Sequence, residues 1–317
     1  MQNEPEVVLS TALKTRKKMS IGVKLFLMIS PFLVISFIFS YFPLYGWVYA
    51  FFNYTPPLRL SQCDYVGLQW FEMLFKNRGQ IDQILMIMRN TFAISGLGIL
   101  TSVLPVIFAI FLSEIKAIKF KKFIQTFTTL PNFISWVLVY AVAFSLFSST
   151  GMVNNLGVSL GIFDQPLKFL DADSFTWIKM CLWSTWKGLG WGAIMYIAAI
   201  AGIDQELYEA ATVDGAGRFK LMRHITIPGI LPTYSVLLLL SVAGFLNNGL
   251  DQYYVFQNAF NKDHIQVLDL YVFNISMGGS NMYSLATALS MLKSIISVVL
   301  LFVVNRLSKW TRGETIV

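Results

Sequence analysis

The sequence predicts an all-α membrane protein with about six transmembrane helices, and three observations support this fold class. Hydrophobic types make up 56% of the 317 residues and charged types only 13%, about half the charged share of an ordinary soluble domain. The mean hydropathy is +0.61. The apolar runs have the length of spanning helices, and none alternates between apolar and polar residues as a barrel strand does.

Each expected span is a run with few or no charges, bounded by charged or polar residues. No charge lies between Lys24 and Arg59, which places the first span, and the second lies between Arg89 and Glu114. Pro131 and the polar residues 148–151 bound the third. The six expected spans are, in order, 25–45, 90–113, 134–147, 175–203, 232–250 and 284–306.

The first apolar run follows basic residues, as the core of a secretory signal would. It is longer than the 7–15 residues of such a core, and no Ala-x-Ala cleavage site follows it. We therefore expect it to be a retained span. The expected organisation is a polar tail over 1–24, a transmembrane domain over 25–306 and a second tail over 307–317.

Lysine and arginine are concentrated on one side of the expected spans. They cluster in residues 14–24, 116–122, 218–223 and 306–312, which an even number of spans places on the same side. Because cytoplasmic loops retain basic residues, both termini are predicted to lie in the cytoplasm, with the chain crossing a bacterial cytoplasmic membrane several times. The net charge of +7 suits an anionic inner leaflet. Nucleic-acid binding is disfavoured because the basic residues are spread over four loops.

The sequence lacks the usual signatures of catalysis. It contains no Walker A motif, no HExxH and no Gly-x-Ser-x-Gly, and its only histidines are His224 and His264. Cys63 and Cys181 have no metal-binding spacing. We therefore predict no catalytic residue, no cofactor and no metal site in this chain. Transport, a channel or a scaffold remain as functions.

The loop over 204–232 has a clear local structure. Asp204 is suited to cap a helix over 205–213, and the acidic residues in that helix complement its dipole. Gly215 suits the left-handed turn that ends the helix. A second short helical piece is expected next, and Pro228 and Pro232 are expected to set the return to the membrane. Two short helices would then form a compact projection.

The same loop carries a pattern of acidic, small and apolar residues at fixed spacing. Its members are Glu209, Ala210, Ala211, Asp214, Gly215, Ala216, Phe219, Ile225, Pro228 and Pro232. This pattern resembles the EAA loop of permease subunits in binding-protein-dependent ABC importers. Its EAAxxDGA form, followed by Ile-x-x-Pro and a second proline, resembles the carbohydrate-uptake branch of that family. Ile227 stands where the family usually has leucine.

The resemblance covers nearly the whole chain and implies a type I ABC importer permease fold that forms half of a pathway for oligosaccharides. It implies that 204–232 holds a coupling helix, with Glu209, Ala210, Ala211, Asp214, Gly215, Ala216 and Phe219 facing a cytoplasmic ATPase. The implied partners are a second permease subunit in a heterodimer, two ATPase subunits that bind ATP and Mg, an extracytoplasmic solute-binding protein and membrane lipid. The alternative interpretation of residues 204–232 is an amphipathic connection that only lies at the membrane interface and binds no partner.

Lys187 and Lys293 lie well inside expected spans, where a charge is costly unless it faces a cavity or a partner. One hypothesis is that both line the translocation pathway and bind sugar hydroxyls or a carboxylate. The alternative is that they reach to the membrane surface. The residues therefore leave open whether the substrate is acidic or neutral.

Aromatic and polar residues near the ends of the fourth and fifth spans are further candidates. Trp183 and Trp186 could stack on sugar rings, although membrane tryptophans more often belong to an interfacial belt. The neighbouring Gly188 and Gly192 are expected to permit close helix packing. A last group either contacts the substrate or merely ends a helix: Asn247, Asn248 and Asp251.

Three other functions compete with oligosaccharide import. An amino-acid or peptide ABC permease is disfavoured by the form of the loop. A secondary transporter would need no ATPase, but such proteins commonly contain internal repeats, which this sequence does not show. A membrane scaffold would not require lysines within the spans.

Overall fold

This computed structural model describes residues 20–312, with side chains described to residue 309. Most of the expected tail over 1–24, and the end of the tail over 307–317, lie outside the described residues. The chain divides into two compact units, Met1–Val48 and Tyr49–Val317. Within the described residues the regular structure is helical, apart from one isolated bridge between Phe52 and Tyr65. The all-α prediction is confirmed.

The first unit contains helix α1, Ile21–Tyr41. Its N-cap is Ser20, whose hydroxyl accepts a hydrogen bond from the Val23 N–H at 3.4 Å. The helix includes Pro31 and continues into the 3₁₀ segment η1, Phe42–Phe51. Length and composition make Ile21–Phe51 a candidate span, as expected for the first apolar run.

The second unit begins with short segments and then a long helical pair. Its first elements are η2 (Leu60–Gln62), α2 (Gln69–Lys76), α3 (Arg78–Thr101) and α4 (Val103–Ser113). Ser102 separates α3 from α4 and donates its hydroxyl to the Ile99 carbonyl at 2.6 Å. The two helices together form a candidate span of 36 residues, longer than the expected one because α3 starts well before Arg89.

The middle of the chain contributes two helices that the charge pattern did not reveal. The elements are α5 (Ile118–Thr129), η3 (Leu130–Phe133), α6 (Trp136–Phe147), α7 (Met152–Ser159) and α8 (Thr176–Ala201). The additional helices are α5, which lies between the second and third expected spans, and α7, which lies between the third and fourth. Ser135 caps α6 by accepting from the Leu138 N–H at 3.4 Å. The limits of α6 and α8 agree closely with the expected third and fourth spans.

Helix α8 is the centre of packing in the second unit, because α3, α4, α5 and α11 all contact it. At Gly190 an added Cβ would lie 2.3 Å from the Thr128 carbonyl oxygen, so α5 approaches α8 at backbone distance. At Gly192 the nearest neighbour would be the Pro105 ring at 3.3 Å. Nothing lies within 4 Å of the corresponding point at Gly188. The packing role expected of Gly188 therefore belongs, within this chain, to Gly190.

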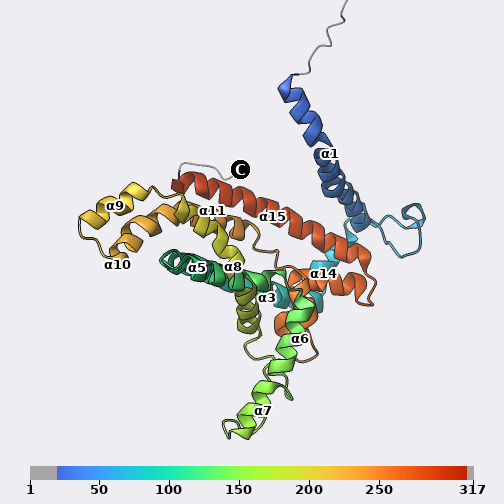
Figure 1. The fold of residues 1–317 in the computed structure, drawn as a ribbon. Helices are drawn as coiled ribbons and strands as arrows, with labels where there is room; N and C mark the ends of the chain where they lie inside the picture. The colour runs from blue at the N-terminus through green and yellow to red at the C-terminus, as the bar shows by residue number, and fades with distance from the viewer. Residues whose placement is uncertain (1–19, 313–317) are drawn as a thin grey trace, which may run out of the picture. The chain divides into compact units, whose positions relative to one another are not determined.

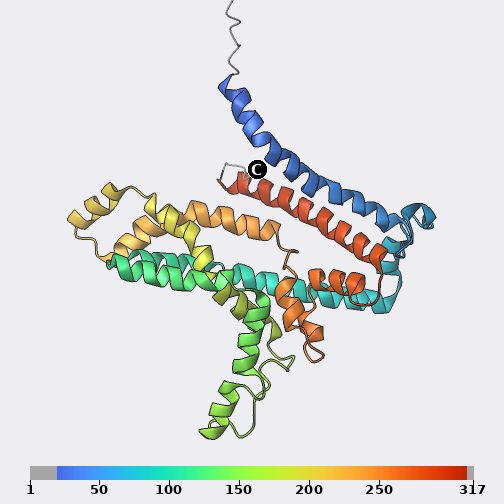
Figure 2. The same cartoon turned by 45° about the vertical axis from the view of Figure 1, so that its right-hand side comes forward.

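The C-terminal part runs from the 204–232 loop to a long final helix. Its elements are α9 (Gln205–Val213), α10 (Arg218–Leu221), the π-helical segment η4 (Met222–Thr226), α11 (Ile227–Ala243), α12 (Asp251–Phe256), α13 (Lys262–Ile265), α14 (Leu268–Met277) and α15 (Tyr283–Arg312). Within the second unit α9 and α10 project together at one end, and α7 lies at another (Figure 1). Helix α15, red in Figure 2, contacts α11 and α14.

Two expectations about the fifth span are wrong. Residues 218–243 form one candidate span, so the piece after Gly217 is continuous with the membrane helix, and Pro232 lies inside α11. The helix then ends at Ala243, not near residue 250. Residues 244–250 are non-helical because tertiary hydrogen bonds, described below, hold their backbone.

Five helical stretches among the described residues are long and apolar enough to cross a membrane. Helices α8 and α9 pass the same criterion as a pair bent by 68°, which brings the number to six. The expectation of about six spans is therefore confirmed. The largest buried cluster joins α3, α6, α8 and the segments after α11, and includes Ile94, Val139, Met180 and Tyr253.

Candidate functional site

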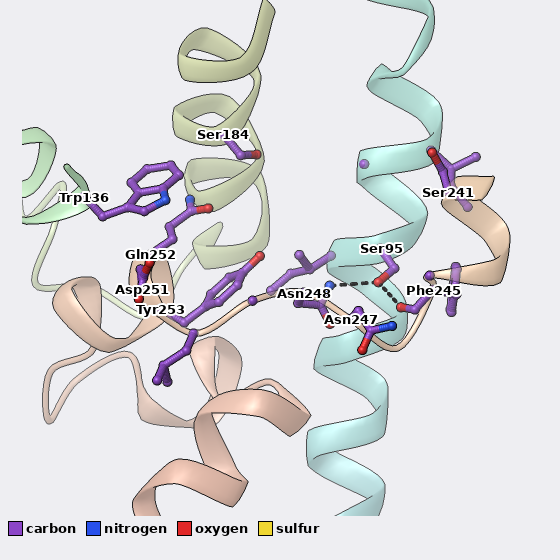
Figure 3. A pocket seen from close by; sticks show the side chains of 16 residues that line it. Ser95, Trp136, Ser184, Ser241, Phe245, Asn247, Asn248, Asp251, Gln252 and Tyr253 are labelled. Atoms are coloured by element: carbon purple, nitrogen blue, oxygen red, sulfur yellow. Dashed lines mark hydrogen bonds between the residues drawn. The ribbon is translucent and has the colours of Figure 1, made fainter. Parts of the chain in front are cut away.

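The segment that follows α11 is held by side chains from helices far away in sequence. Ser95 of α3 donates its hydroxyl to the Phe245 carbonyl at 2.5 Å and accepts from the Asn248 amide at 2.8 Å (Figure 3). Gly249 has a φ of +80°, which glycine adopts without strain. Its N–H donates to the Asp269 carboxylate at 3.0 Å. These contacts replace the helical hydrogen bonds that α11 would otherwise continue.

Helix α12 is anchored to α8 by one buried amide. The Gln252 side chain is 6% exposed and donates to the Met180 carbonyl at 2.7 Å. Tyr253 beside it is also buried in the main core cluster. Because α12 is only six residues long, this anchoring places its first residue, Asp251, at a defined position.

Between α3, α6, α8 and this segment lies a cavity of about 600 Å³, which we call the Asn247 cavity. Its polar and aromatic lining includes Ser95, Trp136, Ser184, Asn247, Asn248 and Asp251 (Figure 3). Asp251 is the only charged side chain among the described residues that line it. The volume lies within the usual range for small-molecule sites. Hydroxyl, amide and carboxylate groups beside an indole can bind sugar hydroxyls and the apolar face of a sugar ring.

Lys187 lies next to this cavity, and its ammonium group is held by the protein. Its Nζ donates to the carbonyls of Pro131 at 3.1 Å and Asn132 at 2.7 Å. It also lies 5.5 Å from the ring centroid of Trp136, within the range of a cation–π interaction. Lys187 lines an adjoining cavity of about 430 Å³, which shares Trp136 and Asp251 with the Asn247 cavity.

Lys293 of α15 does not line either of these cavities, because it forms an ion pair with Asp269 of α14. The same carboxylate accepts the Gly249 N–H through its other oxygen. Lys293 therefore supports the backbone of the cavity segment through Asp269. Both predicted pathway lysines thus interact with protein groups in this structure.

Trp183 and Trp186 are placed elsewhere. Their rings meet edge to face with centroids 5.9 Å apart. They line a third, mainly apolar cavity of about 630 Å³ together with Phe147. The structure therefore brings Asn247, Asn248 and Asp251 together, with Lys187 beside them, and places the two tryptophans in a separate cavity.

Most residues of the Asn247 cavity were not among the sequence candidates, and they include Ser95, Trp136, Ser184 and Gln252. These four come from α3, α6, α8 and α12, and only the packing of these helices brings them together. The sequence contains one signal for Trp136, namely that it follows a helix-capping serine at the start of a span. Such a signal does not reveal that the indole faces a cavity.

The 204–232 loop forms the second candidate region. Asp204 caps α9 by accepting from the Glu206 N–H at 3.0 Å, as expected. Gly215 has a φ of +79°, and the Ala216 N–H donates to the Ala211 carbonyl at 2.9 Å. This is the bond pattern of a Schellman motif. The prediction for α9 and its glycine turn is therefore confirmed.

The members of the loop pattern differ in exposure. Glu209, Ala210, Asp214, Gly215 and Phe219 are exposed, and Phe219 is 83% exposed. Two are half-buried, Ala211 and Ala216. Helix α9 also exposes Leu207 (53%) and Val213 (88%). Helix α9 thus exposes apolar side chains among acidic ones.

Helix α9 is also attached to the start of the membrane helix. The Tyr208 hydroxyl is 3.0 Å from the hydroxyl of Thr226, which is 2% exposed. A Cβ at Gly229 would lie 2.5 Å from Cδ1 of Ile203, so the segment before α9 packs tightly on α11. These two contacts join α9 to η4 and α11.

Spanning helices around a polar cavity, with a short helical projection at one end of the unit, define a membrane permease. The chain belongs to the family of binding-protein-dependent transport system inner membrane components, whose pattern matches residues 102–313. This family consists of transport components, so the expectation that the chain is not an enzyme is confirmed, as is its expected membership of the binding-protein-dependent permeases.

Individual relatives agree with this family. Protein LplB of Bacillus subtilis (strain 168) is 38% identical over 290 residues, which cover 90% of this chain and 88% of LplB. The polygalacturonan/rhamnogalacturonan transport system permease protein YteP of the same organism is 34% identical, with 90% and 87% coverage. A subunit in the crystal structure of a bacterial alginate ABC transporter, in complex with an alginate pentasaccharide-bound periplasmic protein, is similar with a TM-score of 0.80. It is 29% identical and covers 92% of this chain and 96% of that chain. The predicted importer permease fold is confirmed.

Proposed function

We propose that this chain is the permease subunit of an ATP-driven importer of oligosaccharides in the bacterial cytoplasmic membrane, with both termini in the cytoplasm. It forms half of the translocation pathway beside a second permease chain. A cytoplasmic pair of ATPase subunits binds ATP and Mg and acts on α9. An extracytoplasmic binding protein delivers the sugar.

The choice of a sugar as the substrate rests on the residues that line the Asn247 cavity. Amide and hydroxyl groups line part of it, Asp251 contributes one carboxylate, and the Trp136 indole forms part of its wall. Polar groups that bind hydroxyls and an aromatic face that covers a ring are the two requirements of a sugar site. The names of YteP and of the alginate transporter support carbohydrate as the substrate class. An amino-acid substrate would instead require partners for an ammonium and a carboxylate group.

The exposed surface of α9 supports coupling to an ATPase. Leu207 and Val213 are apolar and exposed, while Glu209 lies between them on the same short helix. Exposed apolar groups rimmed by polar ones are typical of protein interfaces. Helix α9 is also capped at both ends, by Asp204 at its start and by the Gly215 turn at its end.

The substrate proposal is tested by uptake into proteoliposomes that contain the complete transporter, with neutral and acidic oligosaccharides offered on the binding protein. Asn247→Leu and Asp251→Leu are expected to lower uptake at least tenfold at constant ATPase association. Ser241→Ala is the control, because Ser241 lines the same cavity but its hydroxyl donates to the Leu237 carbonyl of its own helix. Unchanged uptake in both cavity variants would contradict the proposed pathway. Amino-acid uptake without sugar uptake would contradict the substrate class.

The coupling proposal is tested separately by co-purification with the ATPase. Glu209→Lys reverses the charge of the exposed acidic group and is expected to abolish association. Glu206→Lys, one turn earlier on α9, is the control. It makes the same change of charge at another position and so shows how much of the loss of association is due to net charge alone. Normal association and normal uptake in Glu209→Lys would exclude α9 as the docking element.

A further inference from the structure

We infer that the hydroxyl pair Tyr208–Thr226 is a latch that makes α9 and the membrane helix α11 move as one body, and that it sets how much sugar is moved per ATP hydrolysed. This inference rests on the proposed function, because it assigns a role within the coupling step. Tyr208 and Thr226 are positioning residues in this view, since neither contacts the sugar or the nucleotide.

The connections at the two ends of α9 contain glycines, and the capping bonds there reach only residues of α9 itself. Gly202 lies between α8 and α9, and Gly215 and Gly217 lie between α9 and α10. Glycine has the widest backbone freedom of all residues. A push on the exposed side of α9 would therefore rotate the helix about its ends unless a contact in its middle joined it to the spanning helix.

Tyr208, near the middle of α9, provides that contact. Its hydroxyl reaches the Thr226 hydroxyl at 3.0 Å, and Thr226 is 2% exposed. The bond is part-buried, because Tyr208 is half-buried whereas Thr226 is buried. A buried hydroxyl such as that of Thr226 is costly to leave without a partner. Gly229 and Ile203 form a second contact nearby, but an apolar contact does not fix the relative orientation of the two helices as a hydrogen bond does. The hydroxyl pair is thus the directional connection.

Thr226 is also the last residue of η4, the π-helical segment Met222–Thr226. The Ile227 N–H donates to the Met222 carbonyl, five residues earlier. Single π turns are uncommon and often occur at functional positions. This wider turn lies within the candidate span and directly before α11 begins at Ile227, so a displacement of Thr226 acts on the first turn of α11. The Tyr208–Thr226 hydrogen bond therefore connects α9, the proposed ATPase-docking helix, to the π-helical segment η4 at the start of α11.

The test uses the complete transporter in proteoliposomes and measures both sugar uptake and ATP hydrolysis. Tyr208→Phe and Thr226→Val each remove a hydroxyl and keep the shape of the side chain. Each is expected to lower the sugar moved per ATP roughly fivefold, the size of one net hydrogen bond. The double variant should be no worse than either single variant, because both remove the same bond. Thr226→Ser keeps the hydroxyl and should behave as the unmodified protein.

Co-purification with the ATPase separates the possible outcomes. If Glu209→Lys loses association while Tyr208→Phe keeps a normal uptake-to-hydrolysis ratio, the latch is excluded and the proposed coupling stands. If Glu209→Lys keeps normal association and uptake, the proposed coupling itself fails. Additive losses in the double variant, or loss of assembly in Thr226→Val, would show that the hydroxyls act only in folding and would also exclude the latch.

Discussion

The two ends of α11 are both polar regions beside the same membrane helix, but they are built in different ways. Before α11, the 204–232 loop owes its form to its own residues, with a cap at Asp204 and a left-handed turn at Gly215. After α11, residues 244–251 take their form from Ser95 of α3 and Asp269 of α14. The comparison indicates that the α9 region is locally encoded, whereas the cavity depends on the packing of distant helices.

This difference has consequences for stability and function. Substitutions that disturb distant packing should be costly and should affect the whole unit. Substitutions within the loop should cost less and should act mainly on transport. Three predictions test the comparison, from the largest expected effect to the smallest.

The largest effect is expected at Gly190, where α5 and α8 approach at backbone distance. Gly190→Val places side-chain atoms where the Thr128 carbonyl lies, 2.3 Å from the Cβ position. A backbone carbonyl cannot change rotamer as a side chain can, so α5 and α8 must move apart. We expect this to lower the free energy of unfolding by about 3 kcal/mol or more. The loss of stability is measured by the yield of folded protein in membranes and by thermal denaturation of the purified transporter.

The matched control is Gly188→Val on the same helix, since nothing lies within 4 Å of its Cβ position. We expect this variant to fold nearly normally. Equal losses in the two variants would mean that valine is harmful anywhere in this part of α8, and the close α5–α8 contact would no longer explain the effect.

An intermediate effect is expected at Asp269. Asp269→Leu leaves the Lys293 ammonium without its carboxylate and removes the acceptor of the Gly249 N–H. Breaking such a pair should cost about 2 kcal/mol, less than for a fully buried pair, since the two side chains retain 15% and 20% exposure. Denaturation of the purified transporter, together with uptake, measures the loss.

Lys293→Met combined with Asp269→Leu separates the ion pair from the turn. The double variant should recover part of the stability, because it no longer contains an unpaired charge, while uptake stays low because Gly249 remains without its acceptor. Full recovery of uptake would show that the cavity segment does not depend on Asp269.

The smallest effect on stability is expected in the loop. Gly215→Val forces a β-branched residue to a φ of +79°, which costs about 1–2 kcal/mol. Uptake should fall more than stability does, since the turn positions α9. Gly215→Asn is the control, because asparagine tolerates this conformation better. A drop in stability as large as that of Gly190→Val would remove the distinction between the two ends of α11.

Sequence patterns predicted what depends on local chemistry. The spans follow from apolar runs, and α9 follows from a cap, a short helix and a glycine turn. The positions of Asn247, Asn248 and Asp251 at the end of a span were recognisable as a polar interruption. Trp136 and Ser184 were not recognisable as their neighbours, because they lie on other helices and only packing brings them to the same cavity.

The lysines show the limit of such patterns most clearly. A charge within a span indicates that a partner exists, but not which one. Lys187 is held by carbonyls at 131 and 132 and by the Trp136 ring, and Lys293 by Asp269. These partners come from other elements, so the sequence alone could not identify them.

The sequence by itself determined that the chain is helical, that it is a membrane protein and that it carries an α9 projection, because hydrophobic burial and helix capping act over short stretches of chain. Only the tertiary structure decided where α11 ends, which residues share the Asn247 cavity and what the two lysines contact. Those features depend on the approach of distant helices, which residues such as Gly190 permit but no local pattern specifies.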